Sequence, residues 1–310
     1  MKLDAIEKGL ARYEVVLEPD ENIPEWWAGA PSVVRAPDGV FYLAARMREG
    51  RSPRGRRGYE VRILKSTDGG RRFEPVHRIT REAASVPGFE RPALALDPHT
   101  GRFKLYGCAG LPDGWVILKW DDADNPAKFD AGTARPVLVA QKPEEGFAGV
   151  AGFKDPVVFW DGDRWRMFVI GYDYVERIHH FQSRDGEDWR PAAEGPVMEN
   201  AGWHNFYTRP ASVVPLAVGY LFIYEGSNMC WRDPVYNIAT GLAYSPDLVR
   251  FIDLTPEAPL LRSTTPGAYH TWRYSHWLQA GNRLQVYFEA ARPNNTNEIR
   301  VGVLDIGSVM

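Results

Sequence analysis

The chain has 310 residues, of which 44% are hydrophobic and 13% aromatic, and its formal net charge is −3. The hydrophobic fraction is high enough to bury a sizeable core, which excludes an intrinsically disordered chain. The small negative charge excludes a general attraction to nucleic acid or to an anionic membrane surface.

The N-terminal segment carries charges at Lys2 and Asp4, where a secretion signal would need an apolar run. No stretch approaches the ~18 apolar residues of a membrane-spanning helix. We therefore expect a cytoplasmic protein without a membrane partner. A short helical turn is expected over residues 4–12, and residues 12–17 alternate in the manner of a strand.

A short apolar segment recurs five times along the chain, at intervals of 54 to 64 residues. Four copies contain an Xaa-Pro step, and the fifth copy is degenerate. The copies are Ala30-Pro31-Ser32-Val33, Arg91-Pro92-Ala93-Leu94, Asp155-Pro156-Val157-Val158, Arg209-Pro210-Ala211-Ser212 and Arg273-Tyr274-Ser275-His276. A period of this kind indicates an architecture built from repeated units.

Each copy is followed by a turn signal and then by a second strand of aromatic and branched residues. The third strand of three copies ends in a Ser-x-Asp turn, which begins at Ser66, Ser183 and Ser245. We interpret the Asp residues of these turns as hairpin staples and not as catalytic groups. Ser and Asp side chains commonly hydrogen-bond the backbone of such turns.

These units predict an all-β fold, a five-bladed β-propeller that forms a single domain over residues 1–310. The blades are expected over residues 24–80, 88–140, 150–200, 205–262 and 268–306. The last copy has too few residues for a fourth strand. We therefore predict that residues 12–17 supply this strand and close the ring.

Blades that open with Asp-Pro or Arg-Pro and contain Ser-x-Asp hairpins resemble the five-bladed β-propeller glycosidases, of the type of glycoside hydrolase families 43, 32, 68, 117 and 130. The resemblance covers nearly the whole chain, from about residue 24 to residue 304. It implies a carbohydrate-active enzyme whose catalytic carboxylates open the innermost strands. Lys154-Asp155-Pro156 matches the third-blade motif, but Ala30 and Arg209 stand where two further carboxylates are expected. The chain therefore looks like a divergent member.

Five strand-opening residues are predicted to converge on the propeller axis, namely Ala30, Arg91, Asp155, Arg209 and Arg273. Arg46 is expected nearby, at the end of a second strand. Guanidinium groups bind carboxylate and phosphate in bidentate fashion, so one interpretation is a site for an acidic sugar or for phosphate. The alternative is that each arginine pairs with a neighbouring acid such as Glu90, Asp155 or Glu225.

Two glutamates, Glu225 and Glu289, end apolar second strands at positions equivalent to Arg46. Burial in such a place is expected to raise the pKa of a carboxyl group toward the value that a general acid needs. The alternative is a buried partner for an arginine. Asp155, together with Glu225 or Glu90, is the predicted catalytic pair, and Glu289 is predicted to contact substrate.

Loop residues before the inner strands supply further candidate groups, namely Trp27, His204, Tyr207 and His270. Aromatic faces stack on sugar rings and imidazoles hydrogen-bond hydroxyls, so these residues are predicted to bind a saccharide. The alternative is aromatic packing between blades.

The leading hypothesis is a glycoside hydrolase that acts on an acidic or anion-bearing saccharide. Two alternatives remain open, a glycoside phosphorylase that uses inorganic phosphate and a non-catalytic saccharide-binding propeller. No metal or cofactor motif is predicted, because Cys108 and Cys230 lack metal-type spacing. The sequence leaves open a phosphate or a structural cation bound on the propeller axis.

Overall fold

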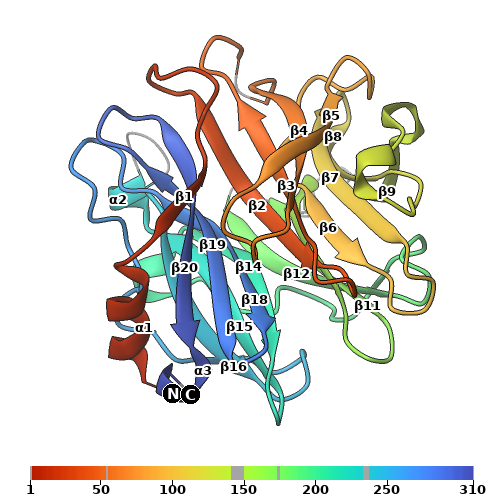
Figure 1. Cartoon of the computed structure of the whole chain (residues 1–310). Helices are drawn as coiled ribbons and strands as arrows, with labels where there is room; N and C mark the ends of the chain where they lie inside the picture. Colours follow the sequence, from red (N-terminus) through yellow and green to blue (C-terminus); the bar gives the residue numbers. More distant parts are fainter. Residues whose placement is uncertain (1, 54, 141–149, 173–174, 233–236, 310) are drawn as a thin grey trace.

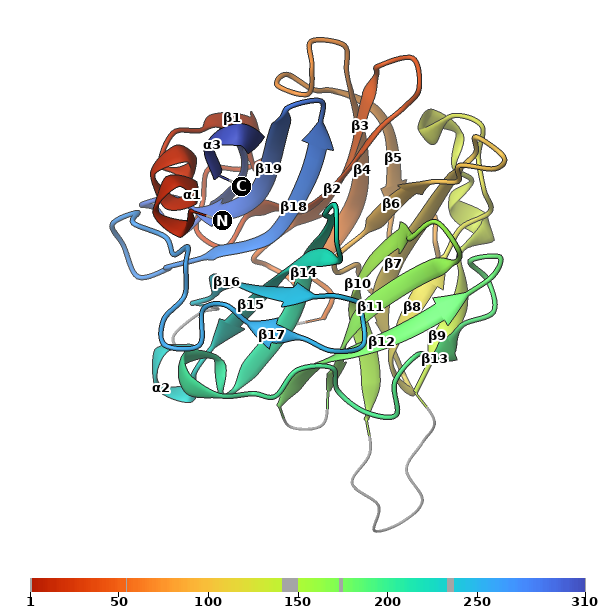
Figure 2. The same ribbon diagram turned by 90° about the horizontal axis from the view of Figure 1, so that it is seen from below.

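The computed structural model describes residues 2–53, 55–140, 150–172, 175–232 and 237–309. Within these ranges the strands form antiparallel groups of four that follow one another around a centre (Figure 2). The first two blades consist of β2 (Trp27–Arg35), β3 (Phe41–Arg48), β4 (Gly58–Ser66), β5 (Glu74–Thr80), β6 (Ala93–Leu96), β7 (Phe103–Leu111), β8 (Gly114–Lys119) and β9 (Arg135–Val139).

The remaining blades continue the same order. They consist of β10 (Gly152–Trp160), β11 (Trp165–Tyr172), β12 (Glu176–Ser183), β13 (Arg190–Pro191), β14 (Tyr207–Pro215), β15 (Tyr220–Ser227), β16 (Ala239–Ser245), β17 (Ile252–Asp253), β18 (Trp272–Ala280), β19 (Arg283–Ala291), β20 (Asn297–Asp305) and β1 (Glu14–Leu17). The predicted all-β propeller fold is therefore confirmed.

Helices are short and lie outside the blades. Those within the described ranges are α1 (Leu3–Leu10), α2 (Met229–Arg232), α3 (Ile306–Val309) and the 3₁₀ turns η1 (Pro126–Lys128), η2 (Ala131–Thr133) and η3 (Gly202–His204). None of the helices in the described part of the chain is long and apolar enough to cross a membrane.

The ring closes through strand β1, as the sequence predicts. β1 pairs antiparallel with β20, with Glu14 opposite Val301 and Leu17 opposite Ile299. The first and last described segments also meet, because the amide of Lys2 donates to the carbonyl of Val309 at 2.8 Å. Figure 1 shows the two ends side by side, with α1 packed along β20. The fifth blade is thus assembled from both ends of the chain.

Each pair of neighbouring blades buries its own hydrophobic cluster. The clusters contain Tyr42 and Leu105 between the first and second blades, Tyr106 and Met167 between the second and third, Phe168 and Phe222 between the third and fourth, Leu221 and Phe288 between the fourth and fifth, and Leu43 and Tyr287 between the fifth and first. This arrangement leaves polar and charged residues to fill the axis.

The Ser-x-Asp turns act as staples. The Ser66 hydroxyl donates to Asp68 Oδ1 at 2.7 Å and accepts from the amide of Gly70 at 3.1 Å. The same Asp68 oxygen accepts from the amide of Arg72 at 3.0 Å. These carboxylates serve the backbone of their own turn, in line with the interpretation of the sequence.

Candidate active site on the propeller axis

A shared bulge in the inner strands determines which residues face the axis. β2, β10, β14 and β18 each lose register with their partner strand by one residue near their start. The register aligns Ala30, Asp155 and Tyr274, and their φ angles are 52°, 56° and 51°. Residues with a Cβ atom rarely adopt this conformation, so its recurrence marks equivalent backbone positions in three blades.

The same register corrects the alignment of the fourth and fifth blades. Arg209 pairs with Glu225 and Arg273 pairs with Glu289, so both arginines are equivalent to Lys154 and not to Asp155. The Xaa-Pro steps do not align in the structure. Pro156 lies within the bulge of β10, whereas Pro210 precedes the bulge of β14 by one residue. The sequence interpretation therefore missed Tyr274, which holds the axial position of the fifth blade.

Asp155 is buried on the axis and accepts hydrogen bonds on both oxygens. Oδ1 accepts from the amide of Arg91 at 3.2 Å and from the Cys108 thiol at 3.6 Å, and Oδ2 accepts from the Tyr274 hydroxyl at 3.0 Å. Burial alone would raise the pKa of Asp155, but Lys154 and three nearby arginines lower it overall. Asp155 is therefore an ionised carboxylate at neutral pH.

Glu225 is completely buried and accepts fewer hydrogen bonds than Asp155. Its Oε1 accepts from the amide of Ser275 at 3.1 Å, whereas Oε2 has no hydrogen-bond partner among the described residues. Burial raises the pKa of Glu225 to about 7, although Arg91 and Arg209 act in the opposite direction. Tyr274 and Ser275 are consecutive, so β18 contacts both the ionised Asp155 and Glu225, whose pKa is raised.

Arg91 crosses the axis from the second blade to the fourth. Its guanidinium donates to the carbonyls of Pro210 at 2.8 Å and Ala211 at 2.5 Å. These acceptors are neutral, and burial accordingly lowers the pKa of Arg91. The Arg91 side chain therefore links the second blade to the fourth through backbone carbonyls.

The other three arginines pair with carboxylates. Arg273 contacts Glu289 through Nε at 3.1 Å and Nη2 at 2.8 Å. Arg46 pairs with both Glu90 and Glu289, and Arg209 pairs with Glu176, which Lys154 also contacts at 2.5 Å. The structure thus favours the alternative in which these arginines pair internally, although several of the partners differ from those expected. Neither Glu176 nor Lys154 was among the site residues predicted from the sequence.

Glu289 departs from the expectation of a raised pKa. Burial raises the pKa of Glu289, but Arg273, Arg46 and Asn297 together lower it below the ordinary value. Its Oε1 accepts from Asn297 at 2.6 Å and its Oε2 accepts from the amide of Ala30 at 3.0 Å. Five donors therefore surround a carboxylate that the sequence could describe only as the end of an apolar run.

Glu90, the third predicted catalytic residue, is more accessible. Its side chain is 20% exposed, against 0% for Glu289, while it forms the ion pair with Arg46. The backbone amide of Glu90 donates to the carbonyl of Cys108 at 3.0 Å, which places Glu90 in register with Lys154. The prediction for Glu90 remains a prediction.

Tyr274 lies in a ring of cations. The guanidinium carbons of Arg273, Arg46 and Arg91 lie 4.8, 5.3 and 5.6 Å from the centroid of its aromatic ring. Burial and the neighbouring Asp155 raise the pKa of Tyr274, so its hydroxyl keeps its proton and donates to Asp155. Adjacency to Arg273 was the only sequence signal that could have pointed to this residue.

The predicted loop residues are mostly buried. Trp27 is 1% exposed and packs beneath Arg48, 3.7 Å from its ring centroid, so the structure favours packing over a free sugar-stacking face. His204 is 2% exposed and contacts Thr208 and Asp253 at 2.9 and 3.3 Å.

Tyr207 and His270 are more exposed, and Tyr207, like Trp27, is the first residue of an inner strand and not a loop residue as expected. Tyr207 is 6% exposed, and its ring lies under Arg209 at 4.6 Å. His270 is half-buried, and its amide donates to Asn237 at 2.8 Å. Of the four predicted loop residues, His270 is thus the most exposed.

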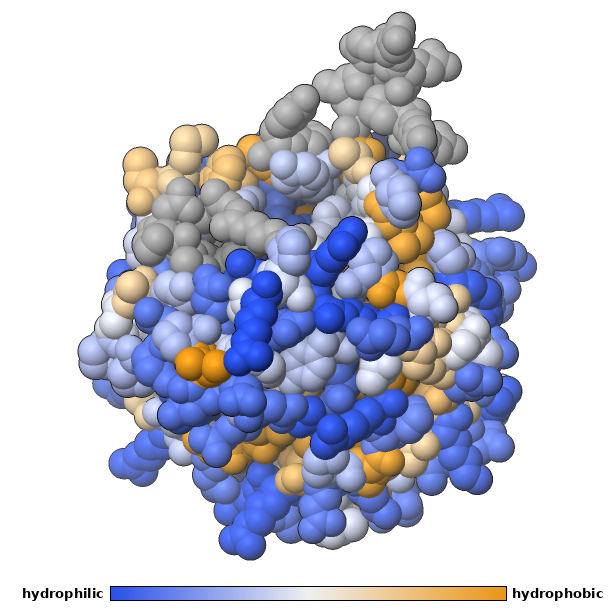
Figure 3. Space-filling model, turned by 90° about the horizontal axis from the view of Figure 1, so that it is seen from above, coloured by the Kyte–Doolittle hydropathy of each residue, from blue (hydrophilic) through white to orange (hydrophobic). Residues whose placement is uncertain are grey.

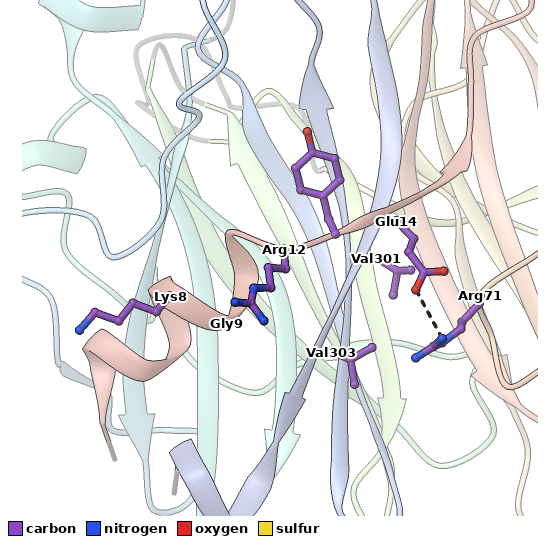
Figure 4. A pocket seen from close by; sticks show the side chains of 8 residues that line it. Lys8, Gly9, Arg12, Glu14, Arg71, Val301 and Val303 are labelled. Carbon is purple, nitrogen blue, oxygen red and sulfur yellow. Dashed lines mark ion pairs between the residues drawn. The ribbon is translucent and has the colours of Figure 1, made fainter.

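The face on which the inner strands begin is largely polar where the structure describes it (Figure 3). In the described ranges, no group of three His, Cys, Asp or Glu residues is placed to hold a metal ion. A separate pocket of about 440 Å³ lies between α1 and the outer strands of the fifth blade (Figure 4). Its lining includes the exposed pair Glu14 and Arg71, 3.5 Å apart, and it lies away from the axis.

No family model matches the sequence, and no curated protein matches it. Solved structures do match. One described as a glycoside hydrolase has a TM-score of 0.74 and 16% identity, over 94% of this chain and 90% of that chain. The fold is that of the five-bladed β-propeller glycosidases. The resemblance drawn from the sequence is thereby confirmed for the fold.

Two further structures carry this glycosidase-propeller fold. A β-1,2-mannobiose phosphorylase from Listeria innocua matches with a TM-score of 0.66 and 12% identity, over 95% of each chain. An α-L-arabinanase from Penicillium chrysogenum, complexed with arabinobiose, matches with a TM-score of 0.60 and 16% identity, over 96% of this chain and 99% of that chain.

Proposed function

We propose that the chain is a carbohydrate-active enzyme, a glycoside hydrolase that uses Glu225 as general acid and Asp155 as its ionised counterpart. One observation carries the proposal. Two carboxyl groups that contact consecutive residues of β18 have pKa values displaced in opposite directions, down for Asp155 and up to about 7 for Glu225. Such a divergence is how one site supplies an acid and a base at neutral pH.

In the proposed reaction the glycosidic C–O bond breaks as the proton of Glu225 moves to the leaving oxygen. Ionised Asp155 stabilises the positive charge that develops on the sugar ring. A water molecule then adds to the anomeric carbon and gives its proton to a carboxylate, either Asp155 or the more exposed Glu90. The unpaired Oε2 of Glu225 is the atom from which the proton would leave.

An acidic or anion-bearing saccharide is the preferred substrate class. Five cationic side chains meet four charge-paired or ionised carboxylates on the axis, namely Lys154, Arg46, Arg91, Arg209 and Arg273 against Asp155, Glu90, Glu176 and Glu289. With Glu225 protonated, the centre has an excess of one positive charge. An anionic group on the substrate would offset this charge in a setting of low dielectric constant.

A non-catalytic saccharide-binding propeller is the second candidate. The observation that favours it is the burial of both carboxyl groups, since Asp155 is 2% exposed and Glu225 is 0% exposed. A hydrolase needs a path by which the glycosidic oxygen reaches Glu225, and a binding protein does not.

The test is a panel of 4-nitrophenyl glycosides and glycuronides, assayed with and without inorganic phosphate. We expect turnover without phosphate, fastest with a glycuronide, and a loss of at least ~100-fold in Asp155→Asn and in Glu225→Gln. Asp185→Asn is the matched control, because Asp185 is bonded to its own hairpin turn.

Turnover that requires phosphate would make the chain a phosphorylase. Saccharide binding without turnover of any panel member would favour the non-catalytic alternative. Undiminished turnover in the Asp155→Asn chain would remove Asp155 from the mechanism.

A further inference from the structure

A small pocket lies beside the fourth blade, away from the axial carboxylates. Its volume is about 220 Å³, and it is lined by Trp203, Asn228, Trp231, Glu257, Ala258, Pro259 and Arg262. Drug-sized ligands occupy pockets of roughly 300–1,000 Å³, so this pocket suits a smaller group. It combines two indole rings with an amide, a carboxylate and a guanidinium, and this composition is neither simply apolar nor simply charged.

Trp203, on η3, is fixed in place as one wall. Its Nε1 donates to the carbonyl of Thr255 at 2.8 Å. Its ring stacks on Tyr224, with centroids 5.7 Å apart and an interplanar angle of 22°. Tyr224 in turn donates to Asp253 at 2.8 Å. The indole therefore cannot turn away from the pocket, and ordering it costs a ligand no side-chain entropy.

A second part of the lining consists of Asn228, which directly precedes α2, and Trp231 of α2. Asn228 Oδ1 accepts from the amide of Trp231 at 2.8 Å, and the carbonyl of Trp231 accepts from Asn237 at the same distance. The backbone of Trp231 is thus held at both its N–H and its C=O. In the described residues, the Nδ2 group of Asn228 makes no hydrogen bond and remains available as a donor.

The third wall is the segment that carries Glu257 and Arg262. It is tethered at one end by Thr255, whose amide donates to Asp253 at 2.8 Å, and at the other by Leu261, which pairs with Thr240 through two backbone hydrogen bonds. Neither Glu257 nor Arg262 forms an ion pair within the part of the chain that the structure describes. Both exposed charges are free to hydrogen-bond a ligand.

The pocket stands at a defined distance from the proposed general acid. Asn228 directly follows Ser227, the last residue of β15, and stands three residues after Glu225. Strands rise about 3.3 Å per residue, so the backbones of Glu225 and Asn228 lie at most about 10 Å apart. The Trp203–Tyr224 stack also ties the pocket to the residue next to Glu225. A ligand that contacts both this pocket and Glu225 would therefore have to be longer than a single sugar ring.

We infer that this pocket is a saccharide subsite, which binds one sugar residue of a chain whose scissile bond lies at Glu225. Indole rings cover the apolar face of a sugar, while Asn228, Glu257 and Arg262 bond its hydroxyls. The inference rests on the proposed function for the placement of the scissile bond. It makes the chain selective for oligosaccharides over disaccharides.

The test measures binding by calorimetry, using the full-length Asp155→Asn chain to prevent hydrolysis. The probes are the hexasaccharides of α-1,5-linked arabinose, β-1,4-linked mannose and α-1,4-linked galacturonic acid, each compared with its disaccharide. We expect at least one hexasaccharide to bind about tenfold more tightly than its disaccharide. Adding Trp231→Ala should abolish that preference. Met229→Ala is the matched control, since Met229 lies on the same short helix, is 66% exposed and does not line the pocket.

The proposal is overturned if no hexasaccharide binds more tightly than its disaccharide, or if the Trp231→Ala chain keeps the preference. Circular dichroism of each variant checks that the fold is intact, and Trp231→Phe should restore part of the preference. The two proposals fail separately. Oligosaccharide preference without turnover of any glycoside would sink the hydrolase and keep the subsite, whereas turnover that is indifferent to Trp231→Ala would do the reverse.

Discussion

Glu225 and Glu289 occupy equivalent positions on neighbouring blades, yet their pKa values are shifted in opposite directions. Glu289 accepts from Arg273, Arg46 and Asn297, which lowers its pKa. Glu225 accepts one amide hydrogen bond and leaves an oxygen unpaired, so burial raises its pKa to about 7. Both residues end an apolar run, and the number of donors that reach each carboxylate decides the difference.

The raised pKa of Glu225 makes stability depend on pH. Between the ordinary value of 4.5 and about 7, the native chain holds a proton on Glu225 that the unfolded chain has released. The contribution of Glu225 to the free energy of unfolding is complete below pH 4.5, falls as the pH rises to about 7 and then stays level, a loss on the order of 3 kcal/mol.

Glu225→Gln removes this loss, so urea unfolding should show the variant gaining on the wild type between pH 5 and pH 8. The exposed Glu194 provides the control, because Glu194→Gln should follow the wild type at every pH. Parallel pH profiles for Glu225→Gln and the wild type would contradict the raised pKa.

Tyr274 is expected to lower the pKa of Asp155. Tyr274→Phe removes the hydroxyl that donates to Asp155 Oδ2, so the ionised carboxylate loses one donor and its pKa should rise. In a pH–rate profile, the acid limb of kcat/KM should move to higher pH and kcat should fall about tenfold.

Tyr287→Phe is the matched control for this effect, because the Tyr287 hydroxyl is also buried but donates to Gly70 of a hairpin. It should lower stability and leave the acid limb in place. An unmoved acid limb in Tyr274→Phe would exclude a tuning role.

At the scale of single elements, β2 and β19 approach each other closely at Gly29 and Glu289. A Cβ atom added at Gly29 would lie 1.8 Å from Glu289 Oε2, which Arg46 and the amide of Ala30 already hold. Gly29→Ala should therefore displace Glu289 and lower the free energy of unfolding by more than ~2 kcal/mol.

Urea denaturation measures this loss. Gly195→Ala should be neutral, since a Cβ atom there meets nothing within 4 Å. If the two alanine variants were equally stable, the carboxylate of Glu289 would have to be free to move.

Local sequence was sufficient for the hairpins and for the strand that closes the ring. The Ser-x-Asp turns are local, because their hydrogen bonds join residues two to four positions apart, such as Ser66 with Asp68 and Gly70. β1 was predictable because its alternation is also local. The propeller fold followed from the repetition of such units.

The axis was less predictable because its contacts are distant in sequence and depend on register. Arg91 bonds the carbonyl of Pro210 across 119 residues, and Tyr274 bonds Asp155 across the same separation. The sequence predicted Asp155 and Glu225 as a catalytic pair, and the structure places both side chains in the buried centre. The sequence interpretation shifted the fourth and fifth blades by one residue, and such a shift exchanges the face to which a side chain points.

At the scale of the whole molecule, the ring is closed by the segment that contains α1 and β1. Ile6 and Leu10 of α1 are buried in the cluster between the fourth and fifth blades. Burying two such side chains contributes about 3–6 kcal/mol. A chain without residues 1–17 should therefore melt roughly 5–10 °C lower than the full chain.

Differential scanning calorimetry tests this expectation, with Lys8→Ala as the control for an exposed change in the same helix. An unchanged melting temperature would mean that the fifth blade does not depend on β1 for its stability.

Three blades keep a residue in the left-handed region at their axial bulge, at Ala30, Asp155 and Tyr274. Each such residue costs about 1–2 kcal/mol relative to ordinary backbone. Selection for stability alone would place glycine at all three positions, which would relax the backbone and delete Asp155 and the hydroxyl that supports it. Backbone stability and the retention of axial side chains thus compete at the same positions, and Ala30 is the one of the three at which glycine would remove no hydrogen-bonding group.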